Sequence, residues 1–439
     1  MGLLPLSYRR PEHVDREEFR RYSTASDGDK SNSSLNSGRS GASSGIPDAL
    51  AFDKIINGGT CPPCTIRDFM NYLIYIEHSA ENLQFFIWYR DYVKRFNEAT
   101  ATDIALALEW TRAMEEETVA RIQKDAADKR KKDHPAASIF KGTDFEKGLD
   151  VIVEKQDPFS TPPRTPPEGV AASIMSGSQA TTYKTQAHDT FSAAGAKQPF
   201  TIQPFRAEID RILATYIADD APRQLNLSAR EQKAVVQALS YTTHPSAFRS
   251  LARSVENTLR QQAHPNFIRW TICNGNPARV SFARGLGAGT VLLSTAGAVV
   301  LTLSGAARGW RALFAAGWAV GIATLITAAK GMCVVLHGMH HRHVRPWELF
   351  VDGDGEEARE KTSFDSFGSS NSSYEDEPWV VRYDRRNVVR KVFDREVWIC
   401  EPALRQIQDT IFVQSVLSAL LGAAVLTAVF VAIPGGNYY

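Results

Sequence analysis

The sequence predicts an all-α protein in which a helical domain, split by a disordered insertion, is followed by three transmembrane helices. Two observations lead to this fold class. Apolar residues recur at spacings of three and four along residues 65–96 and 205–270, as on the buried face of a helix. Nearly all the long uncharged stretches lie after residue 284, although the mean hydropathy of the whole chain is -0.25. No alternation typical of strands persists.

Composition limits the function classes. Among 439 residues, 50 Lys and Arg stand against 49 Asp and Glu, which gives a formal net charge of +1. This balance lacks the basic excess that binds nucleic acid by counterion release, so we expect no nucleic-acid partner. Five cysteines in a long chain do not indicate the disulfide framework of a small secreted domain, so we expect most of the chain to face a reducing compartment.

Residues 1–45 are predicted to be a disordered tail, because they are polar and end in SNSSLNSGRSGASSG. No basic start followed by an apolar core is visible, so the sequence shows no signal peptide. Gly2 does not indicate myristoylation, because Leu6 stands where that motif requires Ser or Thr.

A helical domain is predicted over residues 46–275. Residues 65–96 carry apolar side chains at helical spacing, and residues 101–132 continue as a mostly charged helix. Periodicity resumes at 205–270. Between these parts Pro, Ser, Thr, Gly and Ala dominate, which predicts an insertion of about 140–199 that is looped out. The first predicted buried face consists of Ile66, Phe69, Tyr72, Leu73 and Ile76.

Three transmembrane helices are predicted at 285–307, 312–336 and 410–433, with a loop at 342–409 before the third. About 20 residues cross the hydrocarbon of a bilayer, so the second stretch spans it comfortably only if it continues past Lys330. The alternative for the first two stretches is a buried hairpin of a soluble protein. Their small residues would let the helices approach closely in lipid, or could be neutral filler. These residues are Gly285, Gly287, Gly289, Ala315, Ala316 and Gly317.

Flanking charges predict the orientation. Lys and Arg precede the first span, follow the second and precede the third, which places the N-terminal part and the 342–409 loop in the cytosol. Arg308 and Arg311, in the short link between the first two spans, count against this orientation. In this topology the sequon at Asn371 stays unglycosylated.

Residues 65–96 resemble the opening helices of the regulator-of-G-protein-signalling (RGS) domain. That family pattern is Phe, a Phe/Tyr-Leu pair, Glu, then Glu-Asn-Leu and Phe-Trp. It is matched by Phe69, Tyr72-Leu73, Glu77, Glu81-Asn82-Leu83 and Phe85, with Phe86 in place of the Trp. The segment IDRILATYIADDAPRQLNLS resembles the middle of the family, including the turn at Asn226. The whole plan resembles the fungal bud-site selection membrane proteins of the revert-to-axial type.

The resemblance implies regulation of a GTPase partner, with no catalytic residue and no cofactor in this chain. In the family, the domain clamps the switch segments of a G-protein α subunit in their transition-state arrangement, and the α subunit supplies the reacting groups. Carried over by position, Glu81, Asn82 and Asn226 would contact the α subunit. The alternative is that Asn82 and Asn226 only cap or close turns.

The last helix of the domain departs from the family, which closes with Asp, a short gap and then Arg-Phe. Here Phe267 matches, but Ala263 and His264 stand where the acid is expected and Asn266 replaces the arginine. The missing charges favour an RGS-like scaffold or landmark over an efficient accelerator. The resemblance to bud-site selection proteins implies that it acts in cell polarity and bud-site selection at the plasma membrane. A second polarity membrane protein or a second copy of the chain would be a further partner. The alternative is a membrane-tethered accelerator of α-subunit GTP hydrolysis.

Other motifs carry less weight. Cys61-Pro-Pro-Cys64 has redox or half-zinc spacing, but no second pair follows it, so a Pro-rich turn with ordinary thiols is favoured. Thr161 and Thr165, each before Pro, could accept phosphate from a proline-directed kinase. A histidine group after the second span could bind a metal or sense pH, although its position favours an interfacial flank. Its members are His337, His340, His341 and His343. No phosphate loop or nucleophile set appears, so no enzyme active site and no metal site is predicted.

Overall fold

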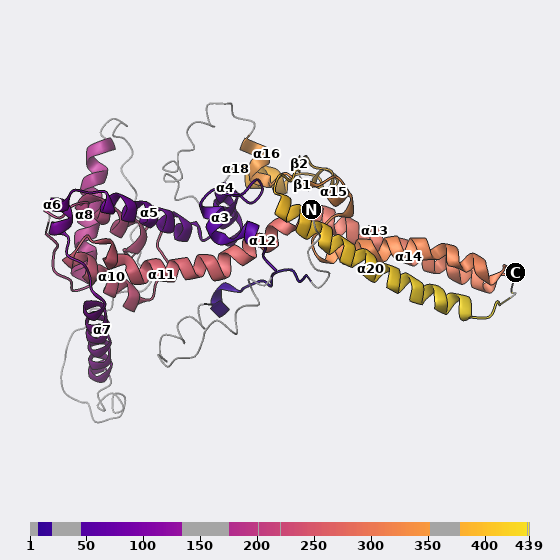
Figure 1. The fold of residues 1–439 in the computed structure, drawn as a ribbon, viewed down its shortest axis with the longest axis horizontal. Coiled ribbons are helices and arrows are strands. Elements are labelled where there is room, and N and C mark those ends of the chain that lie inside the picture. The colour runs from indigo at the N-terminus through magenta and orange to yellow at the C-terminus, as the bar shows by residue number, and fades with distance from the viewer. Residues whose placement is uncertain are drawn as a thin grey trace, which may run out of the picture. The chain divides into compact units, whose positions relative to one another are not determined.

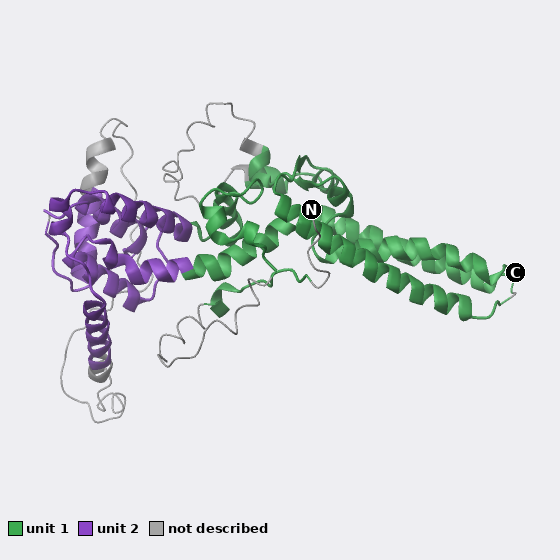
Figure 2. Ribbon diagram, viewed as in Figure 1, with its two compact units in different colours: residues 1–80, 257–439 green, residues 81–256 purple. Residues whose placement is uncertain are grey.

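The computed structural model describes residues 8–19, 45–133, 175–200, 202–219, 221–351, 378–436 and 438. Over these ranges the chain is helical apart from one two-stranded sheet, and three helices are long and apolar enough to cross a membrane (Figure 1). Both findings confirm the predicted fold class. The chain divides into two compact units, which are residues 81–256 (unit 2) and residues 1–80 with 257–439 (unit 1) (Figure 2).

Unit 2 gathers helices from both sides of the predicted insertion around an aromatic core. In this core Phe85 and Phe248 are fully buried with ring centroids 6.0 Å apart, and buried Tyr92 donates a hydrogen bond to the carbonyl of Thr243. The elements are α5 (Ala80–Asn97), α6 (Ala101–Leu106), α7 (Arg112–Asp133), α8 (Met175–Ala193), α9 (Arg206–Ile212), the π-helical η4 (Leu213–Ile217), α10 (Ala229–Tyr241), the 3₁₀ helix η5 (Pro245–Phe248) and α11 (Arg249–Thr258).

Glu208 joins α5 to α9. Its carboxylate accepts two hydrogen bonds from the Arg95 guanidinium, at 2.8 and 2.6 Å, and one from the Trp88 indole at 2.7 Å. Burial alone would raise the pKa of Glu208, but these hydrogen bonds outweigh it and the pKa is lowered. The two sequence halves therefore share a charged contact as well as a core.

Helix α8 lies inside the predicted insertion of about 140–199. Ala187 and Phe191, one turn apart, are buried, and the Arg206 guanidinium lies 5.1 Å from the Phe191 ring centroid. The insertion therefore ends earlier than predicted. Polar side chains dominate the sequence of α8, so hydropathy does not predict this helix, which packing against α9 stabilises.

The helical part of unit 1 is built on a second aromatic core, in which Phe69 and Phe267 have ring centroids 4.9 Å apart. Of the first predicted face, Phe69, Tyr72 and Leu73 are buried, but Ile76 is 44% exposed. Ile76 lies in a π-helical turn, whose wider winding rotates it off the face. The elements are η1 (Asp48–Leu50), α3 (Phe52–Ile56), α4 (Ile66–Tyr72), the π-helical η2 (Leu73–Glu77) and η6 (Leu259–Ala263), and α12 (His264–Ile272).

The segment between the second and third long helices packs onto this core. Trp347 stacks on Tyr75 with centroids 4.8 Å apart, and the amide of Cys400 donates to the carbonyl of Pro62 at 3.0 Å. Residues 45–80 and this segment must therefore lie on the same side of any membrane that the three helices cross. Its elements are α15 (Val334–Gly338), β1 (His341–His343), α16 (Pro346–Val351), α18 (Pro378–Asp384), α19 (Val388–Val392) and β2 (Glu396–Trp398), with β1 and β2 antiparallel.

The three candidate membrane helices run side by side within unit 1 (Figure 1). They are α13 (Pro277–Leu303), α14 (Phe314–Ala329) preceded by the 3₁₀ helix η7 (Arg308–Leu313), and α20 (Pro402–Ala432). The second ends at Ala329 rather than 336, because the chain turns at Gly331, whose φ of 78° is left-handed.

Only some of the predicted small residues lie between helices. A Cβ on Gly321 would stand 2.7 Å from a methyl group of Val291 and 3.0 Å from the carbonyl oxygen of Gly287, so α13 and α14 cross at these glycines. Added Cβ atoms on Gly285 and Gly289 would meet nothing within 4 Å. Close approach in lipid therefore explains the predicted Gly287 and also Gly317, where an added Cβ would clash with the Ser294 hydroxyl. It also explains Gly321, which was not in the predicted set, but not Gly285 or Gly289.

Arg311, which counts against the predicted orientation, has a structural role. Its side chain is 1% exposed and donates to the carbonyls of Phe430 and Ile433, at 2.9 and 2.7 Å. These carbonyls belong to the C-terminal end of α20, where a cation satisfies otherwise unpaired acceptors and favours the helix dipole.

Candidate functional site

The first turn of α5 contains two of the predicted contact residues. Glu81 is half-buried, and a carboxylate at this position is favoured by the helix dipole. The side chain of Asn82 is only 8% exposed. Glu81 therefore reaches the surface of unit 2, whereas Asn82 lies beneath it.

The third predicted residue, Asn226, is exposed at the centre of a three-residue turn. The turn is closed by the hydrogen bond from the Leu227 amide to the Leu225 carbonyl, 2.8 Å long. The following helix, α10, is capped by Ser228, which forms a capping box with Glu231. Asn226 is therefore not the helix cap, and within the described residues its side chain makes no hydrogen bond.

The structure brings the Asn226 loop and the α5 turn together through two side chains. Arg223 of the loop donates to Gln84 of α5 at 3.2 Å. Burial raises the pKa of Tyr216, Arg223 opposes this effect by a hydrogen bond and by its charge, and the nearby Glu81 carboxylate adds to it. The Arg223–Gln84 hydrogen bond therefore holds the Asn226 loop beside the first turn of α5, which contains Glu81.

The N-terminal part of α12, where the charged residues of the family pattern are missing, contacts another segment of the same chain. Asn266 is 4% exposed, accepts from the Val14 amide at 2.8 Å and donates to the Val14 carbonyl at 2.9 Å. His264 is also buried, bonds to the carbonyl of Leu50, and has its pKa lowered to about 4 by burial. Residues 8–19, inside the predicted disordered tail, therefore pack along α12, held by hydrogen bonds that hydropathy does not reveal.

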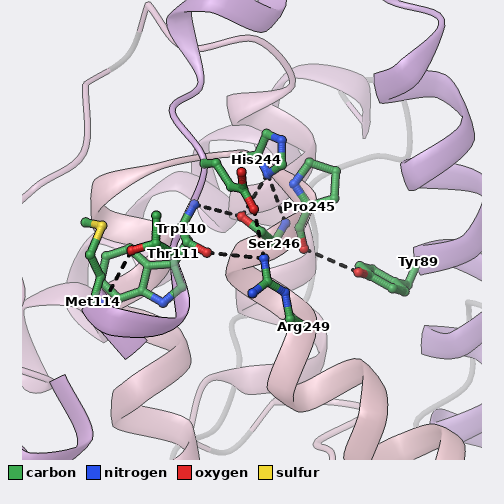
Figure 3. A network of polar contacts seen from close by, with 9 residues as sticks. Tyr89, Trp110, Thr111, Met114, His244, Pro245, Ser246 and Arg249 are labelled. Carbon is green, nitrogen blue, oxygen red and sulfur yellow. Dashed lines mark hydrogen bonds and ion pairs between the residues drawn. The ribbon is translucent and has the colours of Figure 1, made fainter. Parts of the chain in front are cut away.

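A histidine and a serine meet in unit 2, but as a capping network (Figure 3). His244 Nδ1 accepts from the Ser246 amide at 3.1 Å and lies 2.8 Å from its hydroxyl, which accepts from the Trp110 amide at 2.7 Å. Arg249 joins the same network by donating to the Trp110 carbonyl. Because Ser246 is buried, this arrangement holds η5 against the loop after α6 and offers no nucleophile.

The motifs of lower weight form no metal centre in the described ranges. Burial raises the pKa of the Cys64 thiol, which disfavours its thiolate form. Burial lowers the pKa of His337, whose Nε2 lies 3.6 Å from a carboxylate oxygen of Asp409 in α20. Thr161, Thr165 and Asn371 lie outside the described residues.

Comparison with known families identifies one part of the chain. Residues 185–272 match the model of the regulator of G protein signaling domain, so the chain contains an RGS domain. The match covers about a fifth of the sequence, begins within α8 and includes Asn226, whereas Glu81 and Asn82 precede it. No curated protein and no solved structure matches the chain.

Proposed function

We propose that this chain is a membrane-anchored RGS protein that binds a G-protein α subunit and acts as a scaffold more than as an efficient accelerator. The observation that carries the proposal is the RGS match at 185–272 in a chain with three candidate membrane helices. Domains of this family regulate G-protein signalling by accelerating hydrolysis on a partner and have no active site of their own.

The surface proposed to contact the α subunit is the face shared by Glu81 and Asn226. An exposed amide offers both donors and an acceptor to the backbone of a partner, and a half-buried carboxylate offers acceptors. Asn82 is proposed to fix the turn from beneath. Weak acceleration is supported by Asn266, whose hydrogen-bonding groups are taken by Val14 where the family resemblance places an arginine.

The scaffold is proposed to face the cytosol, where G-protein α subunits work. Arg284 and Lys330 lie at the ends of α13 and α14 that are nearer to α12, as the positive-inside rule requires. Arg311 counts against this orientation, but its guanidinium caps the C-terminus of α20. Its charge is therefore a weaker signal of orientation. A place at growth or division sites of the plasma membrane, and a role in bud-site selection with a second membrane protein, rest on the resemblance alone.

Single-turnover GTP hydrolysis separates scaffold from accelerator. The full chain in lipid nanodiscs is mixed with α subunits already loaded with GTP. Truncation is avoided because the segment after α14 packs on the core that contains α12, the last helix of the RGS match. The scaffold proposal expects binding with little change in rate. Acceleration of about 100-fold or more, lost in Asn226→Ala and kept in the exposed control Asn97→Ala, would establish the accelerator instead.

A further inference from the structure

Three cations surround the C-terminus of α14 without carboxylate partners. Arg10 donates to the carbonyl of Lys330 at 2.6 Å, and Arg284 donates to the carbonyl of Ala328 at 3.3 Å. The ammonium of Lys330 has one hydrogen bond, 3.4 Å long, to the Gln414 side chain, so two of its three donors remain. Across the described ranges none of the three cations forms an ion pair.

These cations lie at the depth of lipid headgroups. A helix needs about 20 residues to cross the hydrocarbon. Counting about 20 residues back from Leu303, at the far end of α13, reaches Arg284, and the same count from Ala432 of α20 ends one residue before Gln414. Lys330 directly follows the last residue of α14. All three helices therefore enter the hydrocarbon at this level.

Two hollows lie between α14 and α20, one beside Lys330 and one deeper in the hydrocarbon. The first is a polar pocket of about 380 Å³ that includes Lys330, Gln414 and Ser418. The deeper one is an apolar groove of about 620 Å³ between the same helices, lined by residues such as Ala316 and Ala424. On α14 and at its C-cap the lining positions include Ala319, Ile326 and Lys330, which are seven and four residues apart. On α20 they include Gln414, Leu417, Leu420 and Ala424, which are three or four residues apart, so both hollows lie along one stripe.

We propose that this stripe binds one anionic glycerophospholipid of the cytosolic leaflet. Its phosphate would meet the Lys330 ammonium in the field of Arg10 and Arg284, and an acyl chain would lie in the alanine-lined groove. Basic pockets between membrane helices recognise anionic headgroups in this way. A zwitterionic lipid has no net negative charge to offset the three cations, because its own cation balances its phosphate. The inference rests on membrane insertion and is independent of α-subunit binding.

Native mass spectrometry of the full chain tests the site with phosphatidylserine and phosphatidylcholine as probes. We expect one retained phosphatidylserine, with retention reduced roughly fivefold in Lys330→Gln, as for one interfacial charge, and unchanged in Arg390→Gln, an exposed cation of α19. Ala424→Phe, which fills the groove without changing charge, should also displace the lipid, whereas Leu421→Phe outside it should not.

Three outcomes would overturn the proposal. Equal retention of phosphatidylcholine would remove the charge selection. Retention unaffected by both Lys330→Gln and Ala424→Phe would place the lipid elsewhere. Competition by inorganic phosphate would show a headgroup-only anion site without an acyl groove. If Lys330→Gln fails to fold, the comparison of Ala424→Phe with Leu421→Phe decides alone.

Discussion

Replacing Glu208 by Gln tests whether the two sequence halves are held as one helical unit. Gln keeps the shape but can accept only at one oxygen, and its amide group would face the donors of Arg95 or Trp88. Hydrogen bonds to a charged group contribute about 1.5–3 kcal/mol each. The Arg95 side chain is 36% exposed and can rehydrate, which lowers the net loss to about 2 kcal/mol, or roughly a 30-fold rise in the opening equilibrium.

Hydrogen exchange of the full chain in nanodiscs measures this loss in peptides of α5 and α9. Glu109→Gln is the matched control, because the Glu109 carboxylate is 64% exposed and its pair with Arg249 should contribute less than about 1 kcal/mol. Equal protection in the two variants would refute the structural role of Glu208.

The same contact predicts a dependence on pH. Folding lowers the pKa of Glu208. Its contribution to the free energy of unfolding is therefore present above the pKa of the unfolded state, and it is lost as the pH falls through the pKa of the folded state. The stability difference between the unsubstituted chain and Glu208→Gln should therefore shrink below the ordinary glutamate pKa of 4.5. A difference that stays constant into strong acid would show that the carboxylate charge is not involved.

Three further substitutions test unit 1. Gly321→Ala should destabilise the α13–α14 crossing by about 1–3 kcal/mol, measured as a lower thermal midpoint in nanodiscs, whereas Gly289→Ala should not; equal midpoints would argue against the crossing. Arg311→Met should speed amide exchange in the last turn of α20 far more than Arg308→Met at an exposed position, and equal exchange would remove its capping role. Asn266→Ala should release residues 8–19, seen as faster exchange there with α10 unchanged; unaltered exchange would mean that these hydrogen bonds do not hold the segment.

The sequence predicted what hydropathy and helical spacing encode. Phe69, Tyr72 and Leu73 are buried as expected, and the three long apolar helices lie close to their predicted positions. The prediction that Ile76 is buried was wrong, because the spacing of apolar residues does not reveal a π-helical turn.

The remaining features depend on contacts between distant residues. Polar residues 8–19 are held by Asn266, about 250 positions away in the sequence, and the strands β1 and β2 are too short to show a period. The resemblance named Glu81, Asn82 and Asn226 as contact residues, and this stays a prediction. The burial of Asn82 and the hydrogen bond from Arg223 to Gln84 depend on the fold and were not visible in the sequence.

Binding of the full chain in nanodiscs to a G-protein α subunit tests the central claim most directly. The α subunit is offered with GDP alone and with GDP and aluminium fluoride, which mimics the transition state of hydrolysis. The account predicts binding that is weakened in Asn226→Ala and unchanged in Asn97→Ala, with little preference for the fluoride form, because a strong preference would amount to acceleration. Absence of binding, or binding that Asn226→Ala leaves unchanged, would contradict it.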